Sequence, residues 1–185
     1  MRELLRQAIH LLFGLGIACL VLLAGRDASI AILAGGLLAG VILVDLVLRG
    51  HAIPVISPLL AHLDRDDPLP GRGAFFFAVS ALFCVIIFPE NIVVPALVAL
   101  AVLDSVTTVT GRRFGRHRIY NGKTWEGSLA GIAAAAVALL VFLPPSGALP
   151  AALVAGITEL VSPVDDNLVI PVAVCLLLAA FPALL

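Results

Sequence analysis

Charged residues are scarce in this chain of 185 residues, because Asp, Glu, Lys and Arg make up 12% of it, against about 25% in soluble domains. Apolar residues reach 62%, and the mean hydropathy is +1.17. So few polar groups cannot coat a water-soluble globule, and the composition also excludes an intrinsically disordered segment. The sequence predicts an all-α membrane protein, a polytopic transmembrane helical bundle that forms one domain over residues 1–185.

Cysteine is also scarce, and the three cysteines, Cys19, Cys84 and Cys175, stand singly inside apolar runs. Neither a disulfide framework nor a cluster of thiolate metal ligands is therefore expected. The formal net charge is −1, which gives no indication of the basic face that nucleic-acid binding requires. These shortages favour a function that is carried out in or at the lipid bilayer.

Apolar runs divide the chain into about seven candidate transmembrane helices, where a helical span needs roughly 20 residues. The runs cover residues 8–24, 28–48, 73–88, 91–110, 128–143, 149–161 and 167–185. Between the second and third runs, Ile53, Ile56, Leu60 and Leu63 recur at helical spacing. That spacing predicts a short helix lying in the membrane interface.

Positive charges are divided very unequally between the loops on the two sides of the predicted bundle. Of the 11 Lys and Arg residues, Arg26 alone falls on one side and all the others fall on the opposite side. Cytoplasmic loops of membrane proteins carry such an excess of Lys and Arg. The sequence therefore predicts a multi-pass protein with its N-terminus and its active site on the cytoplasmic face.

Three carboxylates, Asp45, Asp104 and Glu159, interrupt apolar segments, where an ionisable group usually lines a cavity or pairs with a partner. The alternative is that an acid forms an ion pair that serves packing alone. For Asp45 this structural role and a functional role are equally good interpretations. Asp104 is favoured as functional because of the segment that follows it. His10, near the start of the first run, is interpreted as a snorkelling or capping group.

The segment after Asp104 is rich in glycine and basic residues, and reads GRRFGRHR at 111–118 and NGKTWEGS at 121–128. Glycine lets the backbone approach a ligand closely, and Arg and Lys donate to phosphate oxygens. A helix beginning at Ser128 would present free N–H groups to an anion. We expect a polyphosphate cradle here, and the alternative is a basic loop that only satisfies the positive-inside rule.

A third polar group follows Glu159 and consists of Asp165, Asp166 and Asn167. Adjacent carboxylates in a short loop suit a hard divalent cation such as Mg²⁺, although one of these residues could simply cap the next helix. Basic groups in one loop and acids in another, on the same side of the membrane, are what a metal–nucleotide complex requires.

Together these segments resemble the central and late motifs of the polyprenol kinase family, which includes dolichol kinases, phytol kinases and CTP-dependent diacylglycerol kinases. The resemblance rests on Asp104, the glycine-rich segment 111–115, the segment 123–131, and Glu159 with the Asp-Asp-Asn sequence at 165–167. It implies a Mg²⁺-dependent enzyme that transfers the γ-phosphoryl group of CTP to the hydroxyl of a membrane lipid alcohol. The acceptor would be a polyprenol, a phytol-like alcohol or diacylglycerol.

The resemblance also implies roles for individual residues. Mg²⁺ would be bound by Asp104, Asp165 and Asp166, with Asn167 orienting these ligands. The groups that hold the triphosphate would be the side chains of Arg112 and Lys123, the start of the helix at Ser128, and the backbone of Gly111, Gly115 and Gly127. Either Glu126 or Glu159 would accept the proton of the alcohol.

Two other functions remain open. Membrane cytidylyltransferases have a similar architecture and similar metal chemistry, but they attack CTP at the α-phosphorus and release pyrophosphate. A small ion-coupled transporter would relay ions through Asp45, Asp104 and Glu159. A transporter needs acids near the middle of the membrane and access from both faces, whereas these acids are expected toward one face.

Overall fold

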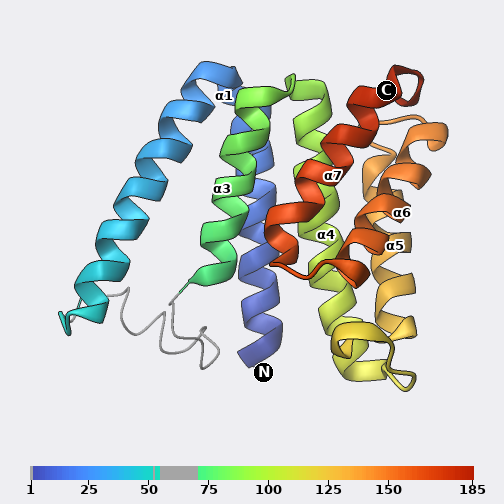
Figure 1. The fold of residues 1–185 in the computed structure, drawn as a ribbon, viewed down its shortest axis with the longest axis horizontal. Helices are drawn as coiled ribbons and strands as arrows, with labels where there is room; N and C mark the ends of the chain where they lie inside the picture. The colour runs from blue at the N-terminus through green and yellow to red at the C-terminus, as the bar shows by residue number, and fades with distance from the viewer. Residues whose placement is uncertain (1, 52, 55–70) are drawn as a thin grey trace.

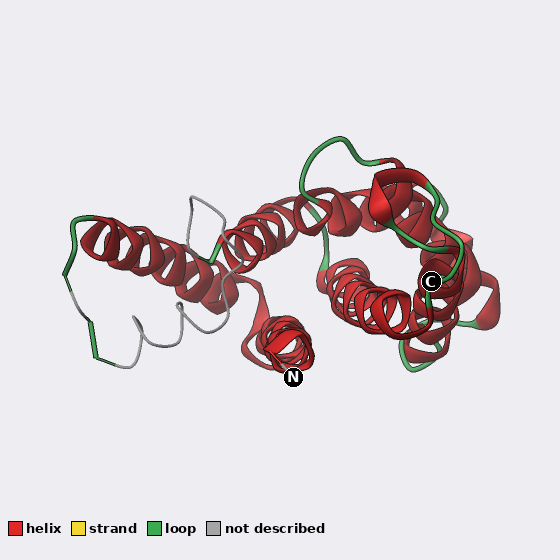
Figure 2. Ribbon diagram, turned by 90° about the horizontal axis from the view of Figure 1, so that it is seen from below, coloured by secondary structure: helices red, strands yellow, loops and turns green. Residues whose placement is uncertain are grey.

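The structure, a computed structural model, describes residues 2–51, 53, 54 and 71–185. Within these residues the chain forms helices and loops and no strand (Figure 2), so the predicted all-α fold is confirmed. Most of the predicted interfacial helix, including Ile56, Leu60 and Leu63, lies outside the described residues. The α-helices are α1 (Arg2–Leu48), α3 (Arg72–Ile87), α4 (Glu90–Phe114), α5 (Trp125–Leu139), α6 (Pro145–Val161) and α7 (Asp166–Ala180), with 3₁₀ turns η1 (Tyr120–Gly122) and η2 (Pro182–Leu184).

Helix α1 is broken at Gly25, whose φ of 75° lies in the left-handed region that glycine adopts without strain. The chain before the break and the chain after it run in opposite directions, so α1 consists of two rods (Figure 1). Next to the break, Arg26 donates hydrogen bonds to the carbonyl oxygen of Val85 at 3.1 Å and to that of Ile86. These carbonyls lie in the last turn of α3, where the helix leaves them without intrahelical partners. Arg26 therefore fastens the break in α1 to the end of α3.

Two helices in the described part of the chain, α1 and α4, are long and apolar enough to cross a membrane by length and composition. The other four are also apolar but contain 15 to 17 residues, fewer than the roughly 20 of a typical span. The helices occupy the predicted runs, but several ends differ by three to six residues. Helix α1 begins at Arg2, α4 ends at Phe114, α5 spans Trp125–Leu139, α6 begins at Pro145 and α7 ends at Ala180. The apolar helices are compatible with a membrane protein, and the count of seven spans stays a prediction.

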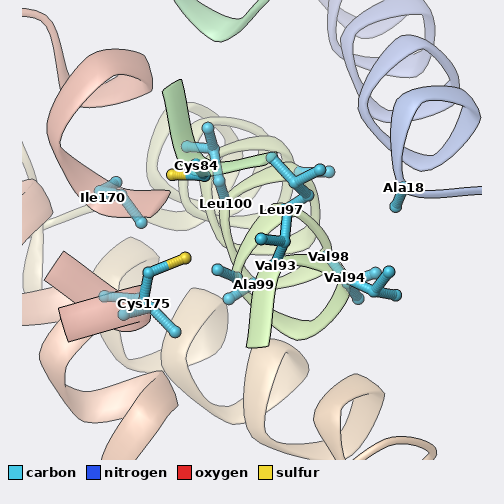
Figure 3. Close-up of a cluster of buried hydrophobic side chains, with 14 of the residues drawn as sticks. Ala18, Cys84, Val93, Val94, Leu97, Val98, Ala99, Leu100, Ile170 and Cys175 are labelled. Carbon is cyan, nitrogen blue, oxygen red and sulfur yellow. The ribbon is translucent and has the colours of Figure 1, made fainter. Parts of the chain in front are cut away.

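Helix α4 is the central element, since it contacts α1, α3, α5, α6 and α7. Every residue from Ile92 to Ala101 is buried. Figure 3 shows part of this core, with Cys84 of α3 beside Leu100 of α4, and Cys175 of α7 beside Ala99. A helix that is apolar on all sides is expected to be surrounded by other elements, and α4 occupies that position.

Helices α4 and α5 lie with their backbones close together because glycines occupy the surface where they meet. A Cβ atom added to Gly127 would lie 2.7 Å from the carbonyl oxygen of Thr107 and 3.0 Å from the Cα of Gly111. One added to Gly131 would overlap the hydroxyl of Thr107. Small residues allow this close approach between helices in membranes. The packing holds the C-terminal end of α4 against the start of α5.

The second half of α1 is packed quite differently. It leans away from the other helices (Figure 1), and many of its apolar side chains are exposed, with Ile32 at 53% and Leu38 at 64%, although Leu33 is buried. A Cβ atom added to Gly36 or Gly40 would meet nothing within 4 Å. Apolar side chains exposed over such a length are suited to lipid rather than to water.

Candidate functional site

Three carboxylates from three different helices meet beside a lysine. Carboxylate oxygens of Asp104 in α4, Glu159 in α6 and Asp166 in α7 all lie within 4.8 Å of one another. The Nζ atom of Lys123 lies 2.8 Å from Oε1 of Glu159 and 3.0 Å from Oδ2 of Asp166. We call these four residues the acid–lysine cluster. Sequence analysis had assigned all four to the site, and the structure brings them together.

The short connection between α6 and α7 positions two of the acids. Glu159 lies in the last turn of α6, and Asp166 is the first residue of α7. The chain reverses direction between them, so both carboxylates lie at the same end of the two helices. Asp104 approaches them from the C-terminal half of the central helix α4.

Lys123 reaches the acids from the loop between α4 and α5. Its carbonyl oxygen accepts a hydrogen bond from the N–H of Ile119 at 2.9 Å, and its own N–H donates to the carbonyl of Tyr120 at 3.2 Å. An isolated antiparallel bridge between Arg118 and Thr124 closes the same turn. The loop backbone is therefore fixed by its own hydrogen bonds, and only the side chain of Lys123 enters the cluster.

The cluster holds three carboxyl groups and one ammonium group. Burial by itself would lower the pKa of Lys123, but the charges of Asp166 and Glu159 outweigh burial and raise this pKa above its usual value. Lys123 is therefore a permanent cation at neutral pH. The side chain of Glu159 has no exposed surface, and its Oε2 atom has no hydrogen-bond partner within the described residues. A buried carboxylate oxygen without a partner is costly, and either a proton or a bound cation relieves that cost.

His10 extends the site, although sequence analysis interpreted it as a snorkelling or capping group. Its Nε2 atom lies 3.3 Å from Oδ2 of Asp104, and its ring packs edge-on against Phe77 at 5.6 Å between centroids. Thr108 donates from its hydroxyl to Oδ1 of Asp104 at 3.5 Å. A polar residue within the first apolar run was the available signal, but nothing in the sequence indicated that it would face Asp104.

Asp165 is not among the three clustered carboxylates, and it pairs with Asn167 instead; the metal-binding role predicted for Asp165 and the orienting role predicted for Asn167 stay predictions. Oδ1 of Asp165 accepts hydrogen bonds from the backbone N–H of Asn167 at 3.2 Å and from its side-chain Nδ2 at 2.9 Å. Oδ2 of Asp165 lies 3.4 Å from Nε of Arg72. Asp165 is thus the N-cap of α7, which is the capping role that the sequence left open as an alternative. It is also an ion-pair partner of Arg72. Glu159 takes its place among the acids.

The start of α5 differs from the anion site predicted at Ser128. The helix begins at Trp125, and the N-cap residue Thr124 accepts hydrogen bonds from Gly127 N–H at 3.2 Å through its hydroxyl and from Ser128 N–H at 2.9 Å through its carbonyl. The N–H of Trp125 donates to the carbonyl of His117 at 3.1 Å. These three N–H groups already have protein partners, so they are not available to a phosphate.

The glycines predicted to cradle phosphate face protein atoms instead. A Cβ atom added to Gly115 would lie 2.6 Å from Cγ2 of Thr124, and one added to Gly111 would lie 3.0 Å from Oγ1 of the same residue. Gly127 lies against Thr107, as described above. Packing between α4, the loop and α5 therefore explains these glycines without a bound nucleotide.

Glu126 holds the basic loop in place. Its Oε1 atom lies 2.6 Å from Nδ1 of His117, and its Oε2 atom accepts from the backbone N–H groups of Arg116 at 3.2 Å and His117 at 3.3 Å. The bond from His117 and the backbone N–H groups lower the pKa of Glu126 to about 2. A carboxylate held ionised in this way is a weak base. Of the two predicted proton acceptors, Glu126 is the less suitable.

Two further predicted residues pair with partners outside the cluster. Arg112 lies with its Nη1 atom 3.1 Å from Oε2 of Glu3, which joins the end of α4 to the start of α1. Asp45 forms an exposed ion pair of 2.8 Å with Arg49, one helical turn away. For Asp45 the structural alternative is therefore the better interpretation.

The basic loop also lines an open cavity of about 480 Å³ with Arg113, Arg116, His117 and Glu126.

The chain is 36% identical over 183 residues to the uncharacterized protein MJ1137 of Methanocaldococcus jannaschii, and the match covers 96% of this chain and 93% of that protein. The two proteins therefore belong to one family. No protein-family profile matches the chain, and no solved structure is similar to it.

Proposed function

We propose that this protein is a Mg²⁺-dependent membrane lipid kinase of the polyprenol kinase family. It would transfer the γ-phosphoryl group of CTP to the hydroxyl of a polyprenol, a phytol-like alcohol or diacylglycerol. The observation that carries this proposal is the acid–lysine cluster, in which residues distant in sequence meet at the ends of apolar helices. The reaction, the nucleotide and the class of acceptor come from the resemblance of the motifs that contain these residues.

The cluster fits a divalent cation that prefers oxygen ligands. When all four groups are ionised, its three carboxylates exceed its one ammonium group by two negative charges, which one divalent ion balances. The unpartnered Oε2 atom of Glu159 offers a buried oxygen for that ion or for the substrate hydroxyl. Asp104, Glu159 and Asp166 would hold Mg²⁺, and the ion would offset phosphate charge during transfer.

The remaining residues of the site bind and position. Lys123 is the cation nearest to the acids and is suited to a phosphate oxygen. His10 and Thr108 would orient the carboxylate of Asp104, because His10 lies beside its Oδ2 atom and Thr108 donates a hydrogen bond to its Oδ1 atom. Because Glu126 is committed to the basic loop, Glu159 is the residue of the two that we assign to accept the proton of the alcohol.

We propose further that the chain is a single domain that crosses the bilayer seven times, with the cluster on the cytoplasmic side. The break at Gly25 divides α1 into two rods of about the length of a span, and the other helices alternate in direction along the chain (Figure 1). The charge bias between the loops supports the orientation. A lipid alcohol would then reach the cluster with its hydroxyl at the membrane surface and its chain in hydrocarbon.

The direct test is a transfer assay with the purified protein, γ-labelled CTP, Mg²⁺ and a panel of polyprenols, phytol and diacylglycerol. We expect label in one class of lipid, with release of CDP. ATP and GTP run in parallel test the nucleotide. Release of pyrophosphate with formation of a CDP-lipid would contradict the kinase and support the cytidylyltransferase, and no reaction with any acceptor would contradict both.

A further inference from the structure

Lys123 is the one lysine in the sequence, and its ammonium group is bound by the acids expected to hold the metal. It contacts Glu159 at 2.8 Å and Asp166 at 3.0 Å, and its side chain is 22% exposed. Both residues belong to the three acids that could hold a metal ion. An amine placed only for phosphate binding would have no reason to lie here without a phosphate.

The ammonium group and a metal ion compete for these two carboxylates. A carboxylate that is paired with the ammonium group of Lys123 attracts a second cation less strongly, because the ammonium charge already offsets part of its negative charge. The ammonium group and a metal ion would also repel each other at so short a distance. Asp104 differs, because its close partners are His10 and Thr108 rather than Lys123. Lys123 thus pairs with two of the three acids of the cluster, and the third, Asp104, lies beside His10 and Thr108.

The side chain of Lys123 can leave the cluster without disturbing the loop. Its backbone is held by Ile119 and Tyr120 through main-chain hydrogen bonds, and the loop is fastened separately by Glu126. Four rotatable bonds separate the Cα of a lysine from its ammonium group. The movement therefore requires only a change of rotamer, and the partly exposed side chain has a route out of the site.

We propose that Lys123 is an internal counter-cation, which pairs with Glu159 and Asp166 in the absence of metal and is displaced when the metal binds. This inference rests on the proposed metal-dependent phosphotransfer. It explains how three closely spaced carboxylates, of which Glu159 is fully buried, are tolerated in the metal-free protein, where unpaired charges would be strongly unfavourable. It also imposes an order, because the ammonium group becomes available to a phosphate only after metal has taken over the acids.

The first test measures Mn²⁺ binding to the detergent-purified full chain by titration calorimetry. Replacing Lys123 by Met keeps the length of the side chain and removes the competing charge, so Lys123→Met should bind Mn²⁺ about tenfold more tightly than the wild type. Arg116→Met is the matched control, since it removes one positive charge from the same loop but from a side chain outside the cluster; its affinity should change less than twofold. Equal or weaker binding by Lys123→Met would overturn the proposal.

The second test uses the wild type alone, in case Lys123→Met does not fold. Because the chain has one lysine, an amine-reactive acetylating reagent reports on Lys123, and the α-amino group serves as internal control. Saturating Mg²⁺ should raise the acetylation rate of Lys123 severalfold while leaving the α-amino rate unchanged. An unchanged or slower rate with bound metal would overturn displacement. Absence of any Mn²⁺ or Mg²⁺ binding to the wild type would instead contradict the proposed metal-dependent function, and this inference with it.

Discussion

The carboxylates of this protein fall into two groups with contrasting surroundings. Asp45, Glu126 and Asp165 each have a polar partner nearby in the sequence: Arg49, His117 and Asn167, respectively. Asp104, Glu159 and Asp166 lie beside one another and beside residues distant in sequence, with Lys123 separated by 36 residues from Glu159 and by 43 from Asp166. Asp104 also accepts a hydrogen bond from the nearby Thr108, which does not account for this convergence. The first group is explained by capping and local pairing. The second has no local explanation, and its members converge on one place.

The contrast is sharpest between two neighbours. Asp165 and Asp166 have the same side chain and adjacent positions, yet Asp165 caps α7 and Asp166 enters the acid–lysine cluster. A helix N-cap needs one side-chain oxygen near the first free N–H groups, and Asp165 supplies it. The adjacent side chain is then free to project into the bundle. Comparing variants at the two positions separates the role of a cap from the role of the cluster.

The largest effect is expected from that comparison. Asp166→Asn should lower lipid phosphorylation by about a thousandfold, because it removes a charged ligand from a site that stabilises transferring phosphate. Asp165→Asn, which retains a capping side chain, should keep activity within about threefold and change stability by less than about 1 kcal/mol. The measurements are label transfer from γ-labelled CTP and thermal unfolding in detergent. Equal losses of activity at both positions would remove the distinction.

His10 provides the next largest effect. His10→Ala removes the group 3.3 Å from Asp104, and loss of a residue that orients a metal ligand typically costs 10- to 100-fold, so we expect roughly that loss in Mn²⁺ affinity. Calorimetric titration of Mn²⁺ measures it independently of turnover. A variant that binds Mn²⁺ as the wild type does would show that His10 serves packing against Phe77 alone.

Substituting glycines tests whether Gly127 is needed for helix packing or for phosphate binding. Gly127→Ala should destabilise the protein by about 1–3 kcal/mol, because the added methyl group would meet the backbone of α4. Gly36→Ala is the matched control in an open position of α1, and it should change stability by less than about 0.5 kcal/mol. Thermal unfolding in detergent measures both. If Gly127→Ala kept the wild-type stability but bound CTP weakly, the phosphate cradle predicted from sequence would be right after all.

The smallest effect is expected at Glu126. Its pKa is lowered to about 2, so its stabilising contribution is present above the ordinary glutamate pKa of about 4.3 and is lost only as the pH falls toward 2. Glu126→Gln should therefore leave the pH profile of activity between pH 5 and 8 unchanged, with turnover within about threefold. Hydrogen exchange of the Arg116 and His117 amides should become faster. Loss of the acidic limb of the pH profile, together with a large fall in turnover, would restore Glu126 as the proton acceptor.

Sequence reasoning located the helices well because apolar runs and their interruptions are local signals. It placed the start of α6 at Leu149 instead of Pro145, because the segment before Leu149 was not counted with the apolar run. It found Asp104 and Glu159 because carboxylates rarely interrupt apolar runs, and it found Asp166 because adjacent carboxylates suit a divalent cation. It left capping by Asp165 as an alternative and began the next helix at Ser128, since capping geometry depends on where a helix begins, within one or two residues. The contact between His10 and Asp104 depends on the packing of α1 against α4, which no local pattern encodes.

The central claim is that Asp104, Glu159 and Asp166 bind one divalent cation together. Crystals grown with Mn²⁺ and a non-hydrolysable CTP analogue would test it by anomalous scattering. The account predicts one strong peak within coordination distance of all three carboxylates, with the Lys123 ammonium group turned toward the phosphates. A well-ordered nucleotide without a peak there, or a peak at Asp165 and none in the cluster, would contradict it.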